Sequence, residues 1–222
     1  MHPIVSFFRT ELKKLADPVK SAQMKAYMKN VQDFYGVPSP QRREILKEGM
    51  TRYPITTFKD YKDVTWELWN GTYREDRYMA LDLSRKLKKF RIDDAMPLFV
   101  RMLKQSDNWD LVDELSVHQI GEMFLTNRKH EALAKKWATD KNFWLRRASI
   151  LVHHNHRKKT NLPLLEKTIV RMMHEKEFFI RKAIGWILRQ YAKTDPKWVL
   201  RFVKTHEHEL SGLSKREALK HL

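Results

Sequence analysis

The chain repeats one local pattern three times, an aromatic residue followed four positions later by a charged residue. The pairs are Trp109 with Asp113, Phe143 with Arg147, and Phe178 with Lys182. Four residues make about one helical turn, so the two members of each pair share a helix face. The pairs recur at steps of 34 and 35 residues, a spacing typical of a repeated helical hairpin. We therefore expect three equivalent helices with aligned aromatic and charged faces, and Trp186 extends the last of these faces.

The remainder of the sequence also predicts helices. Its 222 residues include only six glycines and eight prolines, and apolar residues recur at spacings of three and four. Turn and cap signals divide the chain into short segments. These signals stand at Asp17-Pro18, Pro38-Ser39-Pro40, Asn70-Gly71, Asp107-Asn108, Asp140, Thr160-Asn161, Thr194-Asp195-Pro196 and Ser211-Gly212. We expect an all-α fold in which HEAT-like repeats form one α-solenoid domain over residues 1–222, curved into a superhelix.

The charge indicates a polyanionic partner. The chain has 44 lysines and arginines against 27 aspartates and glutamates, a net charge of +17. Residues 141–222 hold 19 basic and 7 acidic residues, so this part alone carries +12. This distribution predicts a basic concave face that binds nucleic acid. Solvated helix surfaces, acidic membranes and acidic proteins are the alternatives that charge alone leaves open.

Several classes of site are excluded by the residues present. The chain has no cysteine, which rules out disulfides, thiolate zinc sites and cysteine nucleophiles. It also lacks a glycine-rich phosphate loop and the HExxH and GxSxG motifs. His153, His154 and His156 lack partner ligands at metal-binding spacing, so we interpret them as basic surface. No metal, cofactor, export signal or membrane span is expected.

The carboxylate of Asp113 leaves two interpretations open. The repeat alignment places Asp113 beside Arg147 of the next unit, where the two side chains could form a structural ion pair of small worth. Alternatively, Asp113 faces a sugar carbon that becomes positively charged as a glycosidic bond breaks. A single carboxylate suffices for such chemistry when the leaving base is already cationic, because that base departs neutral without protonation.

Eight segments carry a resemblance to a known family. They are MHP at the start, AYMKN around Tyr27, PSPQRR at 38–43, ELW at 67–69, NWDLVD at 108–113, FWLRRASIL at 143–151, EFFIRKAIGWILRQYAKT at 177–194 and LSKREALKHL at 213–222. Over nearly its full length the chain resembles the AlkD-type alkylpurine DNA glycosylases. The resemblance implies a monofunctional enzyme that removes N3-methyladenine and N7-methylguanine from double-stranded DNA and leaves the damaged base stacked. It further implies a monomer without cofactor, membrane or protein partner, in the bacterial cytosol or nucleoid.

The resemblance also assigns roles to individual residues. Asp113 is expected to stabilise the developing sugar cation and position the water, Trp109 and Trp186 to pack on the sugar, and Arg147 to contact a phosphate. The expected DNA contacts are Tyr27, Ser39, Arg42, Arg43, Phe178, Phe179, Lys182 and Arg189. Because Phe178 and Phe179 are adjacent, only one of them can face the core.

Two departures from the family pattern affect expected DNA contacts. Pro38 stands where a glutamine is expected, and Asn155 stands where a lysine is expected. The alternatives to an enzyme are a non-catalytic DNA-binding HEAT-like paralogue and a protein-binding scaffold. Residues 20–36 and the four expected catalytic residues are all present, which favours the enzyme. The net charge of +12 in residues 141–222 argues against a scaffold with an apolar groove.

Overall fold

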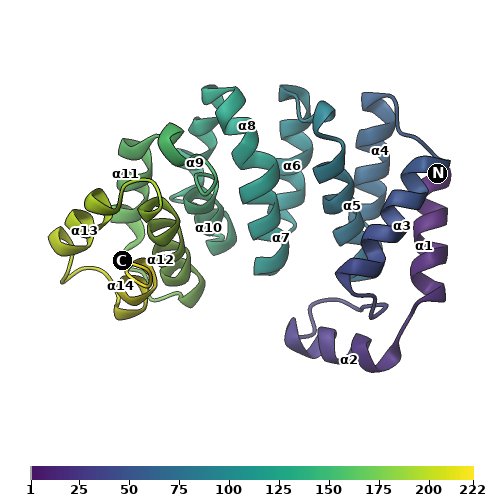
Figure 1. Ribbon diagram of the computed structural model, residues 1–222, viewed down its shortest axis with the longest axis horizontal. Helices are drawn as coiled ribbons and strands as arrows, with labels where there is room; N and C mark the ends of the chain where they lie inside the picture. Colours follow the sequence, from purple (N-terminus) through teal and green to yellow (C-terminus); the bar gives the residue numbers. More distant parts are fainter. Residues whose placement is uncertain (1) are drawn as a thin grey trace. The chain divides into compact units, whose positions relative to one another are not determined.

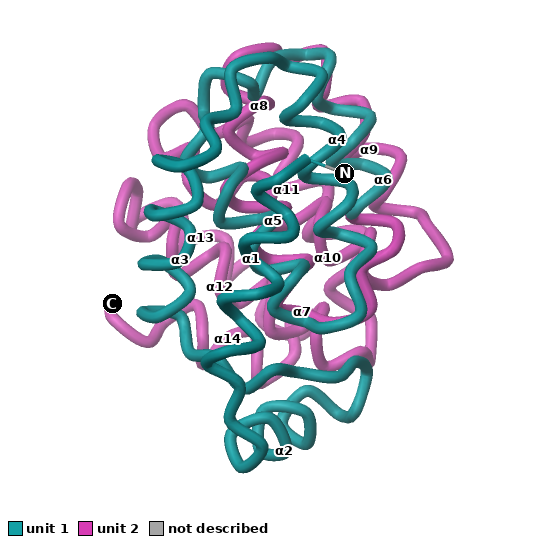
Figure 2. Tube along the Cα trace, turned by 90° about the vertical axis from the view of Figure 1, so that its right-hand side faces the viewer, with its two compact units in different colours: residues 1–102 teal, residues 103–222 magenta. Residues whose placement is uncertain are grey.

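The computed structural model describes residues 2–222 and consists of helices joined by turns and loops (Figure 1). Two compact units are separated inside helix α6, one ending at Met102 and the other comprising Leu103–Leu222 (Figure 2). Over the described residues, β-type pairing is limited to an isolated bridge between Asp33 and Tyr73. The prediction of an all-α fold is confirmed. The superhelical curvature and the single-domain organisation stay predictions.

Unit 1 is built on four packed helices. Its elements are α1 (Pro3–Lys14), α2 (Pro18–Tyr27), α3 (Ser39–Arg52), α4 (Phe58–Trp69), α5 (Arg74–Lys86), η1 (Lys88–Phe90), η2 (Asp93–Ala95) and most of α6 (Met96–Lys104). Helix α1 contacts α3, α4 and α5, and α4 runs along α5. Fully buried Phe8, Trp69 and Met79 supply apolar side chains to this core, and such burial is the main stabilising contribution.

Helix α2 belongs to unit 1 but buries none of its own residues. It stands apart from the other helices of that unit in Figure 1. The loop that follows it is held by the buried carboxylate of Glu75, which accepts hydrogen bonds from the N–H groups of Tyr35, Gly36 and Val37 at 3.0, 2.8 and 3.0 Å. Gly36 has a φ of 88° and passes so close to α2 that a Cβ would lie 2.3 Å from the Asp17 carbonyl oxygen. A carboxylate of α5 therefore holds the loop next to α2.

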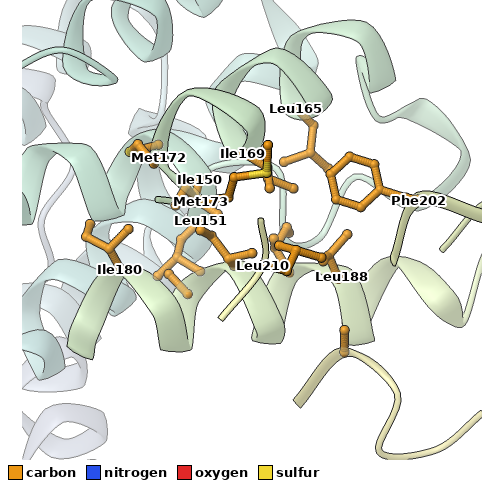
Figure 3. Packing of buried hydrophobic residues seen from close by; sticks show 14 of the residues in the cluster. Ile150, Leu151, Leu165, Ile169, Met172, Met173, Ile180, Leu188, Phe202 and Leu210 are labelled. Carbon is orange, nitrogen blue, oxygen red and sulfur yellow. The ribbon is translucent and has the colours of Figure 1, made fainter. Parts of the chain in front are cut away.

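Unit 2 carries a continuous apolar core. Its elements are α7 (Trp109–Glu114), η3 (Leu115–Ile120), α8 (Gly121–Thr126), η4 (Arg128–His130), α9 (Glu131–Trp137), α10 (Phe143–Leu151), η5 (Arg157–Lys159), α11 (Leu162–Met172), α12 (Phe178–Ala192), α13 (Pro196–Thr205) and α14 (Gly212–Ala218). Figure 3 shows Ile150, Ile169, Ile180 and Phe202 of α10, α11, α12 and α13 packed together. None of the described helices is both long and apolar enough to traverse a lipid bilayer.

The three helices that carry the predicted repeat, α7, α10 and α12, each begin at a side-chain cap. Asn108 accepts a hydrogen bond from the N–H of Trp109 at the start of α7. Asn142 caps α10 in the same way, and Glu177 caps α12. Caps satisfy N–H groups that have no partner within the helix. Because each cap immediately precedes an aromatic residue of the repeat, the three pairs begin at equivalent positions in their helices.

The helix that carries Asp113 contains a π-helical turn. Residues Trp109–Glu114 are α-helical, Leu115–Ile120 form the wider turn, and Gly121–Thr126 return to α-helix without a break. At Gly121 a Cβ would lie 2.6 Å from the carbonyl oxygens of both Ser116 and Val152. The missing side chain therefore permits close packing against the end of α10. Such wide turns are rare and are frequent at functional sites.

Candidate active site

Asp113 and Arg147 form a two-point ion pair between α7 and α10. Arg147 donates from Nε to Asp113 Oδ1 at 2.7 Å and from an Nη to Oδ2 at 2.8 Å. This geometry matches the planar fork of a guanidinium to both oxygens of a carboxylate. The arginine side chain is 4% exposed, whereas the aspartate side chain is 16% exposed. The carboxylate is thus the more accessible member of the pair.

Arg147 also connects this pair to α12. Its remaining Nη donates to the carbonyl oxygen of Phe179 at 2.5 Å. One buried guanidinium therefore joins α7, α10 and α12, and the rings of Trp144 and Phe179 also pack between α10 and α12. We expected Arg147 to contact a DNA phosphate. The structure instead directs it to Asp113 and Phe179, so a phosphate contact would require these bonds to open.

The protonation of Asp113 reflects two opposed effects. Burial raises the pKa of Asp113 above its usual value, because a desolvated carboxylate is disfavoured as an anion. Hydrogen bonds and the positive charge of Arg147 act in the opposite direction. The neighbouring carboxylate of Asp110 adds a smaller upward contribution. Arg147 therefore both orients the carboxylate and favours its charged form.

The two expected sugar-packing tryptophans lie on elements adjoining this pair. Trp109 precedes Asp113 by one turn of α7 and is half-buried. Trp186 lies on α12, partly buried against the core of unit 2. The ring of His154 packs on Trp186 with 4.5 Å between ring centroids. Asp113 and His154 interact electrostatically, so the carboxylate, the imidazole and the indole belong to one neighbourhood.

The histidines following α10 are not the basic surface that we predicted. His153 and His156 are 1% and 2% exposed, and His156 Nε2 lies 2.8 Å from the carbonyl oxygen of Gly121. Burial lowers the pKa of His153 to about 3, and it also lowers the pKa values of His154 and His156. The prediction is wrong because the turn after α10 folds these rings inward. Over residues 2–222 no group of three or more His, Asp or Glu side chains is placed to hold a metal ion.

Apart from Arg147, the expected DNA contacts of unit 2 lie on α12. Phe178 is exposed, whereas Phe179 is half-buried and its ring centroid lies 4.8 Å from that of Trp144. This difference agrees with the expectation that only one of the two adjacent phenylalanines can face the core. Lys182 and Arg189 both pair with one carboxylate of α14, Glu217, at 2.6 and 2.5 Å. Both expected cations of α12 are thus partly neutralised by one carboxylate.

The expected contacts of unit 1 differ in accessibility. Tyr27, at the end of α2, and Arg43, on α3, are exposed, and Ser39 at the start of α3 is half-buried. Arg42 is instead buried, donating to the carbonyl oxygen of Val37 at 3.3 Å with its guanidinium 4.7 Å from the centre of the Tyr78 ring. It supports the packing of α3 in this position, and a DNA contact would require it to leave.

Sequence reasoning did not identify His154 or Glu217 as members of the site. His154 lies in a turn, so the spacing of residues along a helix cannot identify it. Its ring comes into contact with that of Trp186 only when the chain folds. Glu217 stands in the matching C-terminal segment, but its contact with α12 spans 28 and 35 residues of sequence. Both roles depend on tertiary packing, which the sequence pattern does not specify.

Comparisons with known proteins agree on one family. A profile described as DNA alkylation repair enzyme matches residues 8–222. A solved structure described as a predicted DNA alkylation repair enzyme from Enterococcus faecalis is 32% identical, with a TM-score of 0.83, covering 93% of this chain and 96% of its own. The smu.31 protein of Streptococcus mutans UA159 is similar in fold alone, at 18% identity and a TM-score of 0.61, covering 91% of this chain and 99% of its own. A search of curated proteins found no match.

Proposed function

Because the chain belongs to the family of DNA alkylation repair enzymes, we propose that it is a monofunctional DNA glycosylase for cationic alkylpurines in duplex DNA. The substrates would be N3-methyladenine and N7-methylguanine. The observation that carries the proposal is the partly exposed Asp113 carboxylate, oriented by Arg147 at two points. Trp109 lies one turn before Asp113 on the same helix, and Trp186 of α12 packs on His154, which interacts electrostatically with Asp113. We propose that Asp113, Trp109 and Trp186 act on the substrate and that Arg147 positions Asp113.

The chemistry needs one well-placed negative charge. Hydrolysis of the N-glycosidic bond develops positive charge on the sugar ring, and the alkylated base takes the bonding electrons and leaves neutral. Two opposite charges about 4 Å apart interact by ~4 kcal/mol at an effective dielectric constant near 20. This corresponds to roughly a thousandfold in rate. The carboxylate would therefore contribute most of its effect in the transition state, while water supplies the hydroxyl group to the sugar and releases its other proton to the solvent.

Arg147 acts in this proposal as a positioning residue. An approaching sugar meets the more exposed Asp113 before the buried guanidinium, so the attraction of the carboxylate exceeds the repulsion by Arg147. Each carboxylate oxygen that accepts from Arg147 keeps a further lone pair for the attacking water. The neutral His154 behind Trp186 adds no second cation next to the sugar.

We propose that DNA is held by its backbone, with the damaged base left stacked. Phe178, Lys182 and Arg189 of α12 and Tyr27, Ser39 and Arg43 of unit 1 are the proposed contacts. Support comes from the net charge of +12 in residues 141–222 and from the partial or full exposure of these side chains. The family resemblance supports the stacked base, action as a monomer in the bacterial cytosol or nucleoid, and catalysis without a cofactor.

The proposal is tested by measuring free base released from duplex DNA that contains N7-methylguanine. We expect release by the wild type and a loss of at least about a hundredfold in Asp113→Asn, the order produced by removing one electrostatic stabiliser. Glu175→Gln is the matched control, because Glu175 forms a similar two-point pair with the adjacent Arg146 at 2.9 Å.

The outcomes separate the proposed enzyme from its alternative. Equal release by the wild type and Asp113→Asn would remove Asp113 from the mechanism. DNA binding without release by any of the proteins would instead identify a non-catalytic DNA-binding paralogue. A loss in Glu175→Gln as large as that in Asp113→Asn would show that the effect comes from disturbed folding and not from the site.

A further inference from the structure

One carboxylate of α14 bridges two cations of α12. Glu217 Oε1 lies 2.6 Å from Lys182 Nζ, and Glu217 Oε2 lies 2.5 Å from an Nη of Arg189. Lys182 and Arg189 are seven residues apart, two turns along the same face of α12. The two oxygens of a single anion are thus shared between two cations, one oxygen for each.

The packing of α14 on α12 places this carboxylate. Gly185 lies three residues after Lys182 and four before Arg189, and a Cβ at Gly185 would lie 2.4 Å from the Cβ of Glu217. The hydroxyl of Ser214 also donates to the carbonyl oxygen of Arg181 at 2.9 Å. The backbone of α14 is therefore fixed close to α12, while the Glu217 side chain beyond its Cβ can rotate.

The two cations are more accessible than the anion between them. The side chains of Lys182 and Arg189 are 39% and 23% exposed, and that of Glu217 is 13% exposed. An ammonium has three N–H donors and a guanidinium has five, so each cation can bind a second anion. A DNA backbone phosphate presents the same feature as Glu217, two oxygens on one centre that share a single negative charge.

We propose that Lys182 and Arg189 form a binding site for one backbone phosphate of DNA and that Glu217 occupies this site in the free protein. The inference rests on the proposed function, which takes duplex DNA as the ligand and Lys182 and Arg189 as backbone contacts. Binding then exchanges one anion for another: the phosphate enters, Glu217 rotates out, and α14 stays in place. The hydrogen bond from Lys182 and the charges of both cations lower the pKa of Glu217, so the competitor is ionised at neutral pH.

An exchange of this kind has a measurable consequence. In the wild type, each contact of Lys182 or Arg189 with DNA is offset by the lost contact with Glu217. Neither cation should then contribute much to affinity, although both are well placed. Removing the charge of Glu217 should strengthen binding, and it should also make the contribution of Lys182 visible.

The first test compares duplex affinity of the wild type, Glu217→Gln and Glu166→Gln by fluorescence anisotropy with an undamaged duplex. Glu166→Gln is the matched control: it removes the same charge from α11, and among the described residues Glu166 has no ion pair or hydrogen-bonded partner for its side chain. We expect Glu217→Gln to bind about fivefold more tightly than the control, the order that one partly exposed ion pair contributes to an equilibrium. Equal affinity of the two variants, or weaker binding by Glu217→Gln, would overturn the exchange.

The second test measures coupling between the two residues. Lys182→Gln should lower affinity by less than about twofold in the wild type and by about fivefold in the Glu217→Gln background. Equal losses in the two backgrounds would contradict a shared site. These measurements need no base release, so a failure of catalysis leaves them intact. Absence of duplex binding by all variants would instead overturn both this inference and the proposed function.

Discussion

The stability of unit 2 should depend on Arg147 far more than on its neighbour Arg146. Arg147→Met keeps most of the aliphatic volume but removes two hydrogen bonds to Asp113 and one to the Phe179 carbonyl oxygen. Breaking a buried ion pair costs about 3 to 5 kcal/mol, because the remaining charge stays desolvated. Asp113 retains 16% exposure, so water can reach it in part. We therefore expect a loss of about 2 to 3 kcal/mol in the free energy of unfolding.

Arg146→Met is the matched control for this measurement. Arg146 donates to Glu175 and to the carbonyl oxygens of Asp140 and Lys141, but it is 20% exposed, against 4% for Arg147. Water can therefore replace part of its interactions, so we expect its loss to cost only about 1 kcal/mol. Urea unfolding followed by tryptophan fluorescence suits the comparison, because five of the seven tryptophans lie in unit 2. In the double variant Asp113→Asn/Arg147→Met, the loss in the free energy of unfolding should be about 1 to 2 kcal/mol smaller than the sum of the losses in the two single variants. Additive losses, or equal losses in Arg146→Met and Arg147→Met, would refute the assignment of a coupled buried pair.

Two further results are expected. Base release should fall at acidic pH as Asp113 takes up a proton. Arg147 opposes the upward effect of burial on the pKa of Asp113, so this fall should occur at higher pH in Arg147→Met. A pH profile of Arg147→Met identical to that of the wild type would contradict this role. Gly185→Ala should destabilise unit 2 by about 1 to 3 kcal/mol in urea unfolding, because its Cβ would lie 2.4 Å from Glu217 Cβ and 2.9 Å from the Ser214 carbonyl oxygen. Gly212→Ala, with nothing within 4 Å of the added Cβ, is the control, and an equal effect there would refute the steric argument.

Local signals in the sequence were sufficient to locate several elements of unit 2. Asn108, Asn161, Asp195 and Ser211 were predicted boundaries, and each caps a helix through its side chain. Capping depends on only a few neighbouring residues, so it can be read without tertiary information. The same holds for the adjacency of Asp113 and Arg147, since the repeat of 34 residues brings equivalent helix positions together.

The remaining features of the site depend on contacts that a spacing pattern does not encode. The histidine-rich turn has the composition of exposed surface, but its first and last rings are buried. The contact of Glu217 with α12 exists because Gly185 permits close packing of α14, and nothing near Glu217 in sequence signals that approach. The π-helical turn after Asp113 likewise has no marker in the residues Leu115–Ile120. These features therefore depend on tertiary packing and not on local sequence.

The π-helical turn Leu115–Ile120 changes the direction in which the residues after it face. One continuous helix can therefore expose Asp113 in part and still bury the residues that follow the turn. In a regular helix every residue advances the side-chain direction by about 100°, so the outer segment with Trp109 and Asp113 would fix the facing of everything beyond Glu114. The additional residue accommodated in Leu115–Ile120 shifts that phase. Met123 and Phe124 can then face the apolar interior while Asp113 keeps its partial access to solvent. The wide turn thus permits a partly exposed carboxylate and a fully packed following segment within one continuous helix.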